Sequence, residues 1–448
     1  MGGAAAGAAL LGDALGGGGG GPTVVPAPRR RTLWSQFLPK NMAALYAARS
    51  ALILSESAAD DPRYKELPPR FGRMRLLDGD SSVRGATGST GYNTTVYKVV
   101  NHDDGMAYVL RRVDGLRRTT MSPRVCEAVS ARWSKVAHGA VIPLRGVSVH
   151  GAALFFLHDY VPGAQSLAER FLTGAGAAAP LPEALLWSVA CQLATAVRAC
   201  HRAALAMRCV HNPARMLLDA FGRVRFNGAG LLDVLEAESK KSLAELQAGD
   251  VLGLGYLLLA LATRSAAASA TPQESMERVA AAYSPEFAKL VHRLVSVRLS
   301  ADDAVSLLAG RLGDEVSAQY VMVDALDASL AREADNGRML RLCIKLLCVL
   351  ERAEVAGDPS WSEQGDRYML KLLRDHIFHQ TTADGAAPQL DMGHVLEALS
   401  KLDVGHPQRV LLSSRDGRTL LVSSFAEART MLNAAYDELR RGVGPSPA

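Results

Sequence analysis

The chain has 448 residues, of which 48% are hydrophobic and 21% are charged. These values are typical of globular domains and exclude a chain that is disordered throughout. The formal net charge of +5 comes from scattered arginines, so composition alone does not indicate nucleic-acid binding. The six cysteines form no CxxC pair and no zinc-finger spacing, which favours buried free thiols in a reducing compartment.

Residues 1–32 are rich in Gly and Ala, and we expect a disordered, low-complexity leader without the basic region of a secretory signal. Arg29–Arg31 could be a localisation signal or a solvated linker charge, and we favour the linker charge. Residues 33–72 predict a helical segment and a proline-broken linker. The most apolar stretch, Val251–Ala262, is shorter than the roughly 20 residues of a bilayer span, so no membrane association is expected.

Residues 73–312 predict a small sheet lobe followed by a helical lobe. The sheet is predicted from three β-type runs separated by turn residues, at Thr95–Val100, Ala107–Val113 and Ala153–His158. One helix around Pro123–His138 interrupts these runs. From Leu181 to about Leu312 apolar residues recur at helical spacing. The fold class is therefore α+β with two lobes.

Residues 313–350 predict a coiled coil, because apolar residues recur at heptad a and d spacing. These positions hold Val323, Leu326, Leu330, Leu340, Ile344 and Leu347. Between them the same positions hold Glu333 and Gly337, which should break or bend the helix and give a kinked coiled coil. The alternative is a helix that packs against its own domain.

Residues 351–448 predict a compact terminal domain that contains Trp361. We expect a helix at Asp366–His379 and strands at Arg409–Leu412 and Thr419–Val422. Asp375, His376 and His379 could imitate a metal site, but histidines three residues apart without further ligands are usually surface or core polar residues. No metal is therefore expected.

Six short motifs occur in the order and spacing of a protein kinase, and together they indicate its two-lobed fold. They are Thr94–Lys98 after the glycine-rich loop, Tyr108–Arg111 on the lysine strand, His138–Leu144 after helix C, Leu157–Leu167 at the adenine hinge, Met216–Gly222 at the end of the catalytic loop, and Asp250–Gly255 at the start of helix F.

The residues that phosphoryl transfer needs are absent from these motifs. A kinase uses an aspartate to accept the hydroxyl proton, and an asparagine and an aspartate to hold magnesium. Those three positions hold Val210, Arg215 and Gly228. Without carboxylates there is no base and no magnesium ligand, so catalysis by the kinase mechanism is excluded. Of the three loop glycines only Gly91 is in register.

Binding of a nucleotide without transfer stays open. Arg111 stands at the position of the ATP-pairing lysine and keeps a permanent positive charge, although Glu127 is out of register to pair with it. The hinge from Asp159 to Ser166, together with Arg215, could complete such a site. The alternative is that Arg111 and Arg215 are solvated structural charges at the old positions.

The chain resembles the pseudokinase regulatory subunit of the poly(A)-specific ribonuclease complex, over about residues 35–440. The resemblance is most specific at Leu330–Arg338, Asp358–Glu363, Gly365–Leu372 and Arg374–Gln380, and extends upstream to Gly91–Lys98, Leu110–Arg112, Asp159–Tyr160 and Pro162–Ala164. It implies the order of a pseudokinase domain, a coiled coil and a C-terminal knob.

The resemblance also implies a function. The family's homodimer, formed through the coiled coil, holds and stimulates the catalytic nuclease subunit in the cytoplasm and in P-bodies, and its pseudokinase site binds ATP or an adenosine of the tail. Carried over by position, the nucleotide contacts are Arg111, Asp159, Tyr160, Val161, Pro162, Gly163, Ala164, Gln165, Ser166, Ala214 and Arg215. The pair Ala214 and Arg215 departs from the hydroxyl and lysine expected there.

Two further partners of the family are the weakest expectations. Members often begin with a zinc finger for poly(A) RNA and a segment for the poly(A)-binding protein, but no cysteine precedes Cys126.

Two rival functions stay open. An active, atypical kinase would show magnesium-dependent phosphate transfer, and an unrelated dimeric pseudokinase scaffold in signalling would fail to capture the nuclease subunit.

Overall fold

The computed structural model describes residues 38–57, 64, 67–77, 92–116, 122–173, 179–352, 358–382 and 387–442. The chain divides into two compact units. Within the described residues, the first comprises Ala43–Tyr320, and the second comprises Val321 onward with the short stretch that ends at Met42. The predicted leader and the glycine-rich loop, including Gly91, lie outside the described residues.

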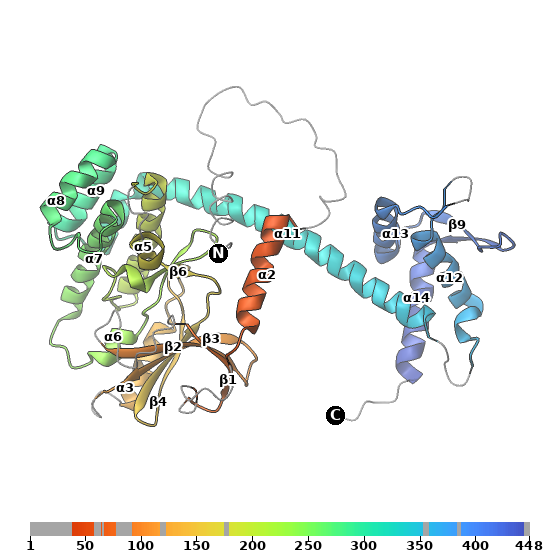
Figure 1. The fold of residues 1–448 in the computed structure, drawn as a ribbon, viewed down its shortest axis with the longest axis horizontal. Helices are drawn as coiled ribbons and strands as arrows, with labels where there is room; N and C mark the ends of the chain where they lie inside the picture. The colour runs from red at the N-terminus through yellow and green to blue at the C-terminus, as the bar shows by residue number, and fades with distance from the viewer. Residues whose placement is uncertain are drawn as a thin grey trace, which may run out of the picture. The chain divides into compact units, whose positions relative to one another are not determined.

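Helix α2, Lys40–Leu54, which lies in the predicted helical segment, precedes a five-stranded antiparallel sheet in the first unit (Figure 1). Its strands lie in the order β1-β2-β3-β5-β4, with β1 at Phe71–Leu76, β2 at Asn93–Asn101, β3 at Ala107–Asp114, β4 at Leu144–His150 and β5 at Ala153–Asp159. Helix α3, Pro123–Trp133, packs beside β4 and buries Cys126, Val129 and Trp133. The three predicted β-type runs therefore correspond to β2, β3 and β5.

Helices and a small three-stranded sheet form the second lobe of this unit. Their bounds are β6 Gln165–Ser166, α4 Leu167–Phe171, α5 Glu183–Arg202, η3 Pro213–Arg215, β7 Met216–Leu218, β8 Val224–Phe226, α6 Leu231–Leu235, α7 Leu243–Thr263, α8 Pro272–Ala282, α9 Pro285–Ser296 and α10 Ala301–Leu307. Capping boxes at Ser166, Ser242 and Ser300 begin α4, α7 and α10.

Helix α7 is the most apolar element of the first unit. By length and composition alone it could cross a membrane, yet 67% of its most apolar window is buried inside the lobe. Leu254, Leu257 and Leu258 belong to the same core as Leu193 and Val197 of α5. This burial is the pattern of a core helix.

The six cysteines are free thiols in the structure. Cys126, Cys191, Cys200 and Cys209 are buried, whereas Cys348 is exposed. Burial raises the pKa of the Cys191, Cys200 and Cys209 thiols to about 12. These three thiols therefore stay protonated and unreactive at neutral pH.

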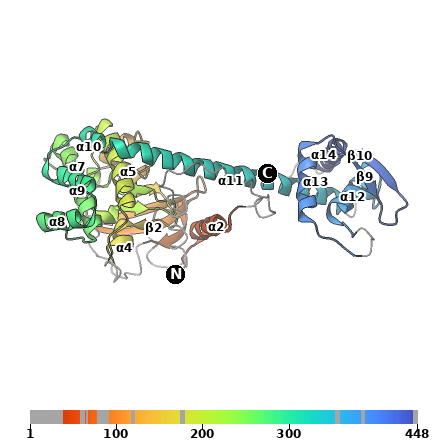
Figure 2. The same cartoon turned by 90° about the horizontal axis from the view of Figure 1, so that it is seen from above.

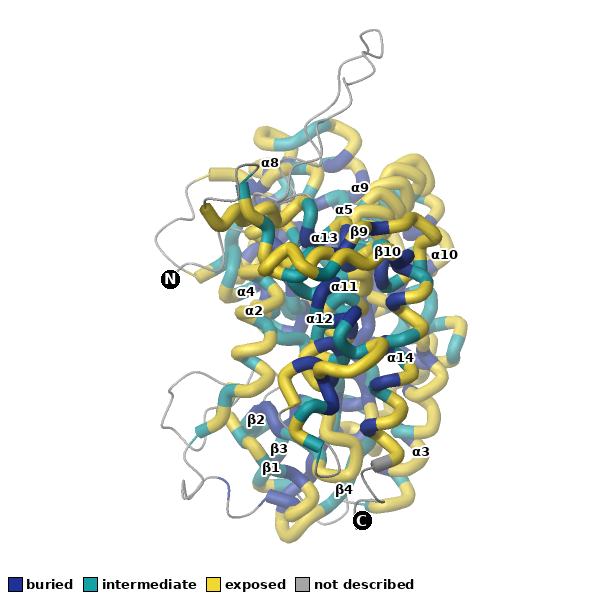
Figure 3. The backbone as a smooth tube through the Cα atoms, turned by 90° about the vertical axis from the view of Figure 1, so that its right-hand side faces the viewer, coloured by how far each residue is buried: buried dark blue, intermediate teal, exposed yellow. Residues whose placement is uncertain are grey.

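The second unit is a helical knob with one β-hairpin (Figure 2). After α11, Ala309–Leu350, come η4 Trp361–Glu363, α12 Gly365–Phe378, α13 Met392–Val404, β9 Arg409–Ser413, β10 Leu420–Ser424 and α14 Phe425–Gly442. The predicted helix and both predicted strands are present. Helix α14 shows buried positions alternating with exposed ones along its length (Figure 3), because only one of its faces covers the core.

Helix α11 has two faces in the second unit. Leu342, Leu346 and Val349 belong to the core of the knob. Leu340, Ile344 and Leu347 are large apolar residues that are exposed. The alternative of a helix packed on its own domain therefore accounts for one face only. The knob core also extends upstream of residue 351, where the sequence placed the domain boundary.

No break occurs in α11 at the two positions where the sequence predicted a break or a bend. Glu333 and Gly337 both lie within the continuous helix, and Gly337 is not among the residues with positive φ. A glycine in a helix interior costs only about 1 kcal/mol against alanine. That cost is too small to interrupt a helix whose C-terminal turns are fixed in the knob core. A bend in the coiled coil stays a prediction.

Candidate functional site

The register of the first sheet brings Arg111 and His158 to one face. Arg111 pairs with Phe156 across β3 and β5, and His158 pairs with Val109. Since alternate residues of a strand share a face, Arg111, Phe156 and His158 point to the same side. Phe156 belongs to the large core that continues into the helical lobe. The face that carries Arg111 and His158 is therefore the one directed at the second lobe.

A 3-10 turn fixes Arg215 in the helical lobe. Asn212 caps this turn by accepting a hydrogen bond from the backbone N–H of Ala214 at 3.0 Å. Pro213, which has no N–H to satisfy, suits the first position of the turn. The Arg215 carbonyl then accepts from Asn227 N–H at 2.8 Å. Ala214 offers a ligand nothing polar from its side chain, so the departure noted in the sequence is real.

Arg111 and Arg215 are buried, with 5% and 3% of their surface exposed. The alternative that both are solvated charges is therefore wrong, because neither guanidinium group has bulk water around it. Both are close enough to His158 to lower its pKa through their charge. The structure thus gathers Arg111, Arg215 and His158 around one buried point.

His158 is neutral at physiological pH. Burial, with Arg111 and Arg215, lowers the pKa of its imidazole to about 4, against a raising contribution from a hydrogen bond to Ala229. Its Nε2 lies 3.0 Å from the Ala229 carbonyl oxygen. A carbonyl can only accept, so Nε2 carries the hydrogen and Nδ1 is an acceptor.

Hydrogen bonds to neighbouring elements and a glycine turn fix the hinge residues at and after the end of β5. Asp159 accepts two hydrogen bonds from Arg145, at 2.6 and 2.8 Å. Gly163 has a φ of +75°, which only glycine adopts without strain. Ser166 is occupied as the N-cap of α4, where its hydroxyl accepts from Glu169 N–H at 3.2 Å. Gln165 is exposed.

A hollow of about 290 Å³ borders the hinge. Of the predicted site residues, its lining contains Asp159, Tyr160, Val161 and Pro162, joined by Arg49 and residues of the β7–β8 turn. Arg111, Ala214 and Arg215 do not line it. The predicted site is therefore divided, with the hinge at this hollow and the two arginines buried beside His158.

The three positions that lost their catalytic residues are closed to a metal. Val210 is buried, and a Cβ at Gly228 would come within 2.9 Å of the Phe226 ring. Arg215 places a cation where the asparagine ligand would stand. In the described part of the chain no group of three His, Cys, Asp or Glu residues could hold a metal ion. Magnesium does not fit these residues.

Asp250 keeps a structural role beside the positions that lost their catalytic residues. It is buried and accepts hydrogen bonds from the backbone N–H groups of Met207 at 2.7 Å and Arg208 at 2.5 Å. His201 Nε2 lies 3.1 Å from the same carboxylate. This carboxylate therefore holds the chain just before Val210 in place, although Val210 can no longer act as a base.

Sequence reasoning missed three residues of this region. Arg145, on a strand that was not predicted, holds Asp159. His158 was part of the hinge motif but had no role assigned. Lys98 is fully buried, and its Nζ donates to the carbonyls of Ser55 at 2.8 Å and Arg73 at 3.2 Å. Burial lowers the pKa of Lys98. Only the spacing of the motif could have drawn attention to His158.

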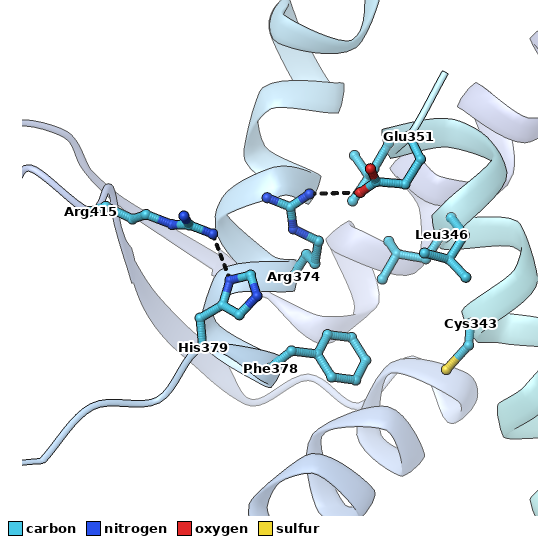
Figure 4. Close-up of a pocket in the computed structure, with 9 residues that line it drawn as sticks. Cys343, Leu346, Glu351, Arg374, Phe378, His379 and Arg415 are labelled. Atoms are coloured by element: carbon cyan, nitrogen blue, oxygen red, sulfur yellow. Dashed lines mark hydrogen bonds and ion pairs between the residues drawn. The ribbon is translucent and has the colours of Figure 1, made fainter. Parts of the chain in front are cut away.

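The second unit contains a groove of about 500 Å³ between the end of α11 and α12 (Figure 4). Leu346, Leu347 and Phe378 give it an apolar wall, and charged side chains form its edge. Arg374 contacts Glu351 at 2.9 Å, and Arg415 contacts His379 Nδ1 at 2.8 Å. The groove therefore combines an apolar wall with a largely basic edge.

The three residues that could imitate a metal site do not converge. Asp375 accepts from Arg415 at 3.0 Å and pairs with His379 at 2.8 Å. Burial would raise the pKa of Asp375, but hydrogen bonds from Arg415, His379 and Arg374 hold it below its ordinary value. His376 instead stacks edge-on against His394, with ring centroids 5.0 Å apart.

Comparisons with known proteins cover both units. A family model described as the Pan3 C-terminal knob domain matches residues 301–439. The subunit pan3 of the PAN2-PAN3 deadenylation complex from Dictyostelium discoideum is 35% identical, over 92% of this chain and 56% of its own length. Its human counterpart is 33% identical, over 78% and 43%. The chain spans about half the length of the curated relatives it matches.

Two solved structures share the fold. The Drosophila melanogaster PAN3 pseudokinase is 31% identical with a TM-score of 0.69, covering 84% of this chain and 100% of that one. Neurospora crassa PAN3, its pseudokinase and C-terminal regions solved in complex with PAN2, is 29% identical with a TM-score of 0.72, covering 90% and 100%. Both matches cover the two-lobed fold of this chain, in which Val210 and Gly228 stand at the positions of the catalytic aspartates. The chain therefore belongs to the PAN3 family of pseudokinases.

Proposed function

We propose that the chain is the non-catalytic regulatory subunit of a cytoplasmic poly(A)-nuclease complex. In this proposal it forms a homodimer through α11, and the dimer recruits and stimulates the catalytic nuclease subunit in shortening mRNA poly(A) tails. The relatives named as PAN2-PAN3 deadenylation complex subunits and the relative solved with PAN2 support this assignment. P-bodies, poly(A) RNA and the poly(A)-binding protein are further proposals from the family alone.

One observation carries the dimer, namely an apolar stripe on α11 that the chain itself leaves exposed. Leu330 is 68% exposed, Leu340 63%, Ile344 48% and Leu347 54%. These residues occupy heptad a and d positions, which lie along one side of a helix, and Glu333 and Gly337 occupy the two such positions between Leu330 and Leu340. A row of exposed leucines is unfavourable in water and is typical of a surface that another chain covers. A second copy of α11 offers the same stripe in the same register.

The opposite side of α11 supports a fixed dimer geometry. Leu342, Leu346 and Val349 are buried among α12, α13 and α14 residues of the knob. Because this face is committed to the core, α11 cannot rotate to hide its exposed stripe. A homodimer would therefore hold two knobs in a set orientation, which suits the recruitment of one partner by two copies.

The test introduces charge into the stripe. Leu340→Asp or Ile344→Asp should give monomers in light scattering, since a carboxylate would be buried in the seam without a partner. The same variants should capture less nuclease subunit in a pull-down. Ala331→Asp, an exposed position off the stripe, is the matched control and should stay dimeric. An unchanged mass for Leu340→Asp would contradict the coiled-coil assignment.

A second candidate function concerns the nucleotide cleft that we infer from the buried cluster of Arg111, Arg215 and His158 and from the hinge beside it. We propose that it binds ATP, or an adenosine of the tail, without phosphoryl transfer. Two buried guanidinium groups can meet phosphate oxygens, which bind arginine in a charge-assisted geometry. Arg215 supplies a cation at the position where a magnesium ligand stood, so the phosphates would be neutralised without metal.

Thermal unfolding tests the nucleotide proposal. ATP should raise the melting temperature equally with and without magnesium, because ligand bound to the folded state stabilises it. Arg111→Met, which keeps a long apolar stem but removes the charge, should lose that rise. Arg202→Met, at an exposed ion pair with Asp302, is the control. Autophosphorylation that depends on Arg111 would refute the non-catalytic assignment.

A further inference from the structure

His158 has one ring nitrogen that the described protein leaves without a partner. Nε2 donates to the Ala229 carbonyl at 3.0 Å, but Nδ1 is buried and makes no hydrogen bond within the described residues. The side chain as a whole is 1% exposed. An acceptor that is buried without a donor costs about 1–3 kcal/mol. Such a group therefore calls for a donor that the described residues do not supply.

Protonation cannot relieve this nitrogen. Burial and the charges of Arg111 and Arg215 keep the imidazole neutral, with a pKa of about 4. At physiological pH, Nδ1 therefore stays an acceptor. The missing donor must come from outside the ring, from a ligand or from a trapped water molecule.

The position of His158 suggests which ligand this is. Asp159, the next residue, begins the hinge that the sequence motif predicts for the adenine base. Arg111 shares the sheet face with His158, and Arg215 approaches from the other lobe. A nucleotide with its phosphates at the two arginines and its base edge at the hinge would place the 6-position of a purine near His158.

We propose that His158 Nδ1 accepts a hydrogen bond from the exocyclic amino group of adenine and makes the cleft selective for adenine over 6-oxopurines. This inference rests on the proposed function, in which the cleft holds a nucleotide. Adenine carries a donor at its 6-position, whereas guanine and hypoxanthine carry a carbonyl oxygen. A carbonyl oxygen facing Nδ1 would bring two acceptors together and leave both without a hydrogen.

The experiment compares ATP with two nucleotides that are changed at the 6-position of the purine, one of which, inosine triphosphate, also carries a hydrogen on N1. Isothermal titration of the full chain, without magnesium, would use ATP, purine riboside triphosphate with only hydrogen there, and inosine triphosphate with oxygen there. A neutral hydrogen bond corresponds to roughly a 2- to 12-fold preference for ATP over the purine analogue. Inosine triphosphate should bind more weakly than the purine analogue. Any cost of opening the closed cleft is common to all three and cancels from these ratios.

Two variants separate the hydrogen bond from the shape of the ring. His158→Leu removes the acceptor, so ATP and the purine analogue should bind within about 2-fold of each other. His158→Asn keeps an oxygen acceptor close to the position of Nδ1 and should retain the preference for ATP. His150→Leu is the matched control, since His150 is an exposed histidine at the end of β4. It should leave all three affinities unchanged.

The outcomes are distinct. Equal binding of ATP and the purine analogue by the unsubstituted chain would overturn the inference, because a trapped water would then satisfy Nδ1. This comparison decides the matter even if His158→Leu fails to fold. Absence of binding by all three nucleotides would overturn both this role and the proposed nucleotide site, while leaving the dimeric adaptor untouched.

Discussion

The two units depart from the ordinary burial pattern in opposite ways: the first buries charged side chains, and the second exposes large apolar ones. In the first unit the charged residues Lys98, Arg111 and Arg215 are buried, where charged side chains are rare. In the second unit Leu340 and Leu347 stand exposed on a helix whose other face is packed. Arg111 and Arg215 belong to the proposed nucleotide site, and the exposed leucines belong to the stripe on which the proposed dimer rests. In both units, the residues that depart from the ordinary burial pattern are the ones on which the proposed functions rest.

The largest effect is expected where the first unit depends on a buried charge. Asp250→Ala would leave the N–H groups of Met207 and Arg208 without an acceptor. We expect it to lower the free energy of unfolding by about 3–5 kcal/mol. Scanning calorimetry would measure this, with Asp302→Ala, at an exposed ion pair, as a nearly silent control. A small effect of Asp250→Ala would mean that these buried hydrogen bonds contribute little to the stability of the first unit.

Two neighbouring leucines test the two faces of α11. Leu346→Ala removes a buried side chain from the knob core and should cost about 2–5 kcal/mol of stability. Leu347→Ala, one residue along and exposed, should leave the melting temperature of the monomer nearly unchanged but weaken the dimer. Calorimetry and sedimentation would be measured on both variants. If the two variants behaved alike, the assignment of separate faces would fail.

A pH titration tests the buried cluster of the first unit. The folded pKa of His158, about 4, lies below the ordinary value of 6.5. Its contribution to stability is therefore complete above pH 6.5 and is lost as the pH falls toward 4, since the unfolded chain takes up the proton first. Between pH 7 and pH 5 this amounts to about 2 kcal/mol. His158→Leu should flatten that part of the denaturation profile, and an unchanged slope would count against the neutral imidazole.

The smallest effect is expected at the edge of the hinge. Arg145 and Asp159 form a two-pronged ion pair, but half of the Arg145 side chain is exposed to water. Arg145→Ala should therefore change the free energy of unfolding by less than about 1 kcal/mol. Urea denaturation would measure it at low and high salt. A loss of several kcal/mol would show that the hinge relies on this pair.

Much of the fold could be predicted from the sequence, because the spacing of apolar residues and the turn residues are signals that lie within each segment. Strands β2, β3 and β5 are apolar runs between turns, and α12 carries a clear amphipathic pattern. Strand β4 was missed because its Gly146 weakens the β pattern and its pairing shifts register there. Strand β1 has a similar irregularity between Gly72 and Arg75. Their extended conformation comes from pairing, of β4 with β5 and of β1 with β2, which these irregular local patterns do not indicate.

The sequence could predict which residues occupy the candidate site, but not whether their side chains are buried or what they contact. Motif spacing located Arg111 and Arg215 and showed that Val210 and Gly228 cannot do chemistry. It could not show that both arginines are buried, because the residues that cover a charge come from other elements. The orphaned nitrogen of His158 depends on the Ala229 carbonyl, 71 residues away in the chain. Long-range contacts of this kind are absent from any local pattern.

The last turns of α11 have a consequence for how this protein can be divided. Leu342, Leu346, Val349 and Leu350 supply part of the knob's core, so the knob has no complete interior without them. A fragment that begins after Leu350 would lack these four buried residues and should fail to fold. The matching family model, residues 301–439, likewise begins upstream of this helix. The end of α11 and the knob therefore share one core, and any fragment that keeps Leu342 in that core also keeps the exposed side chains of Ile344 and Leu347.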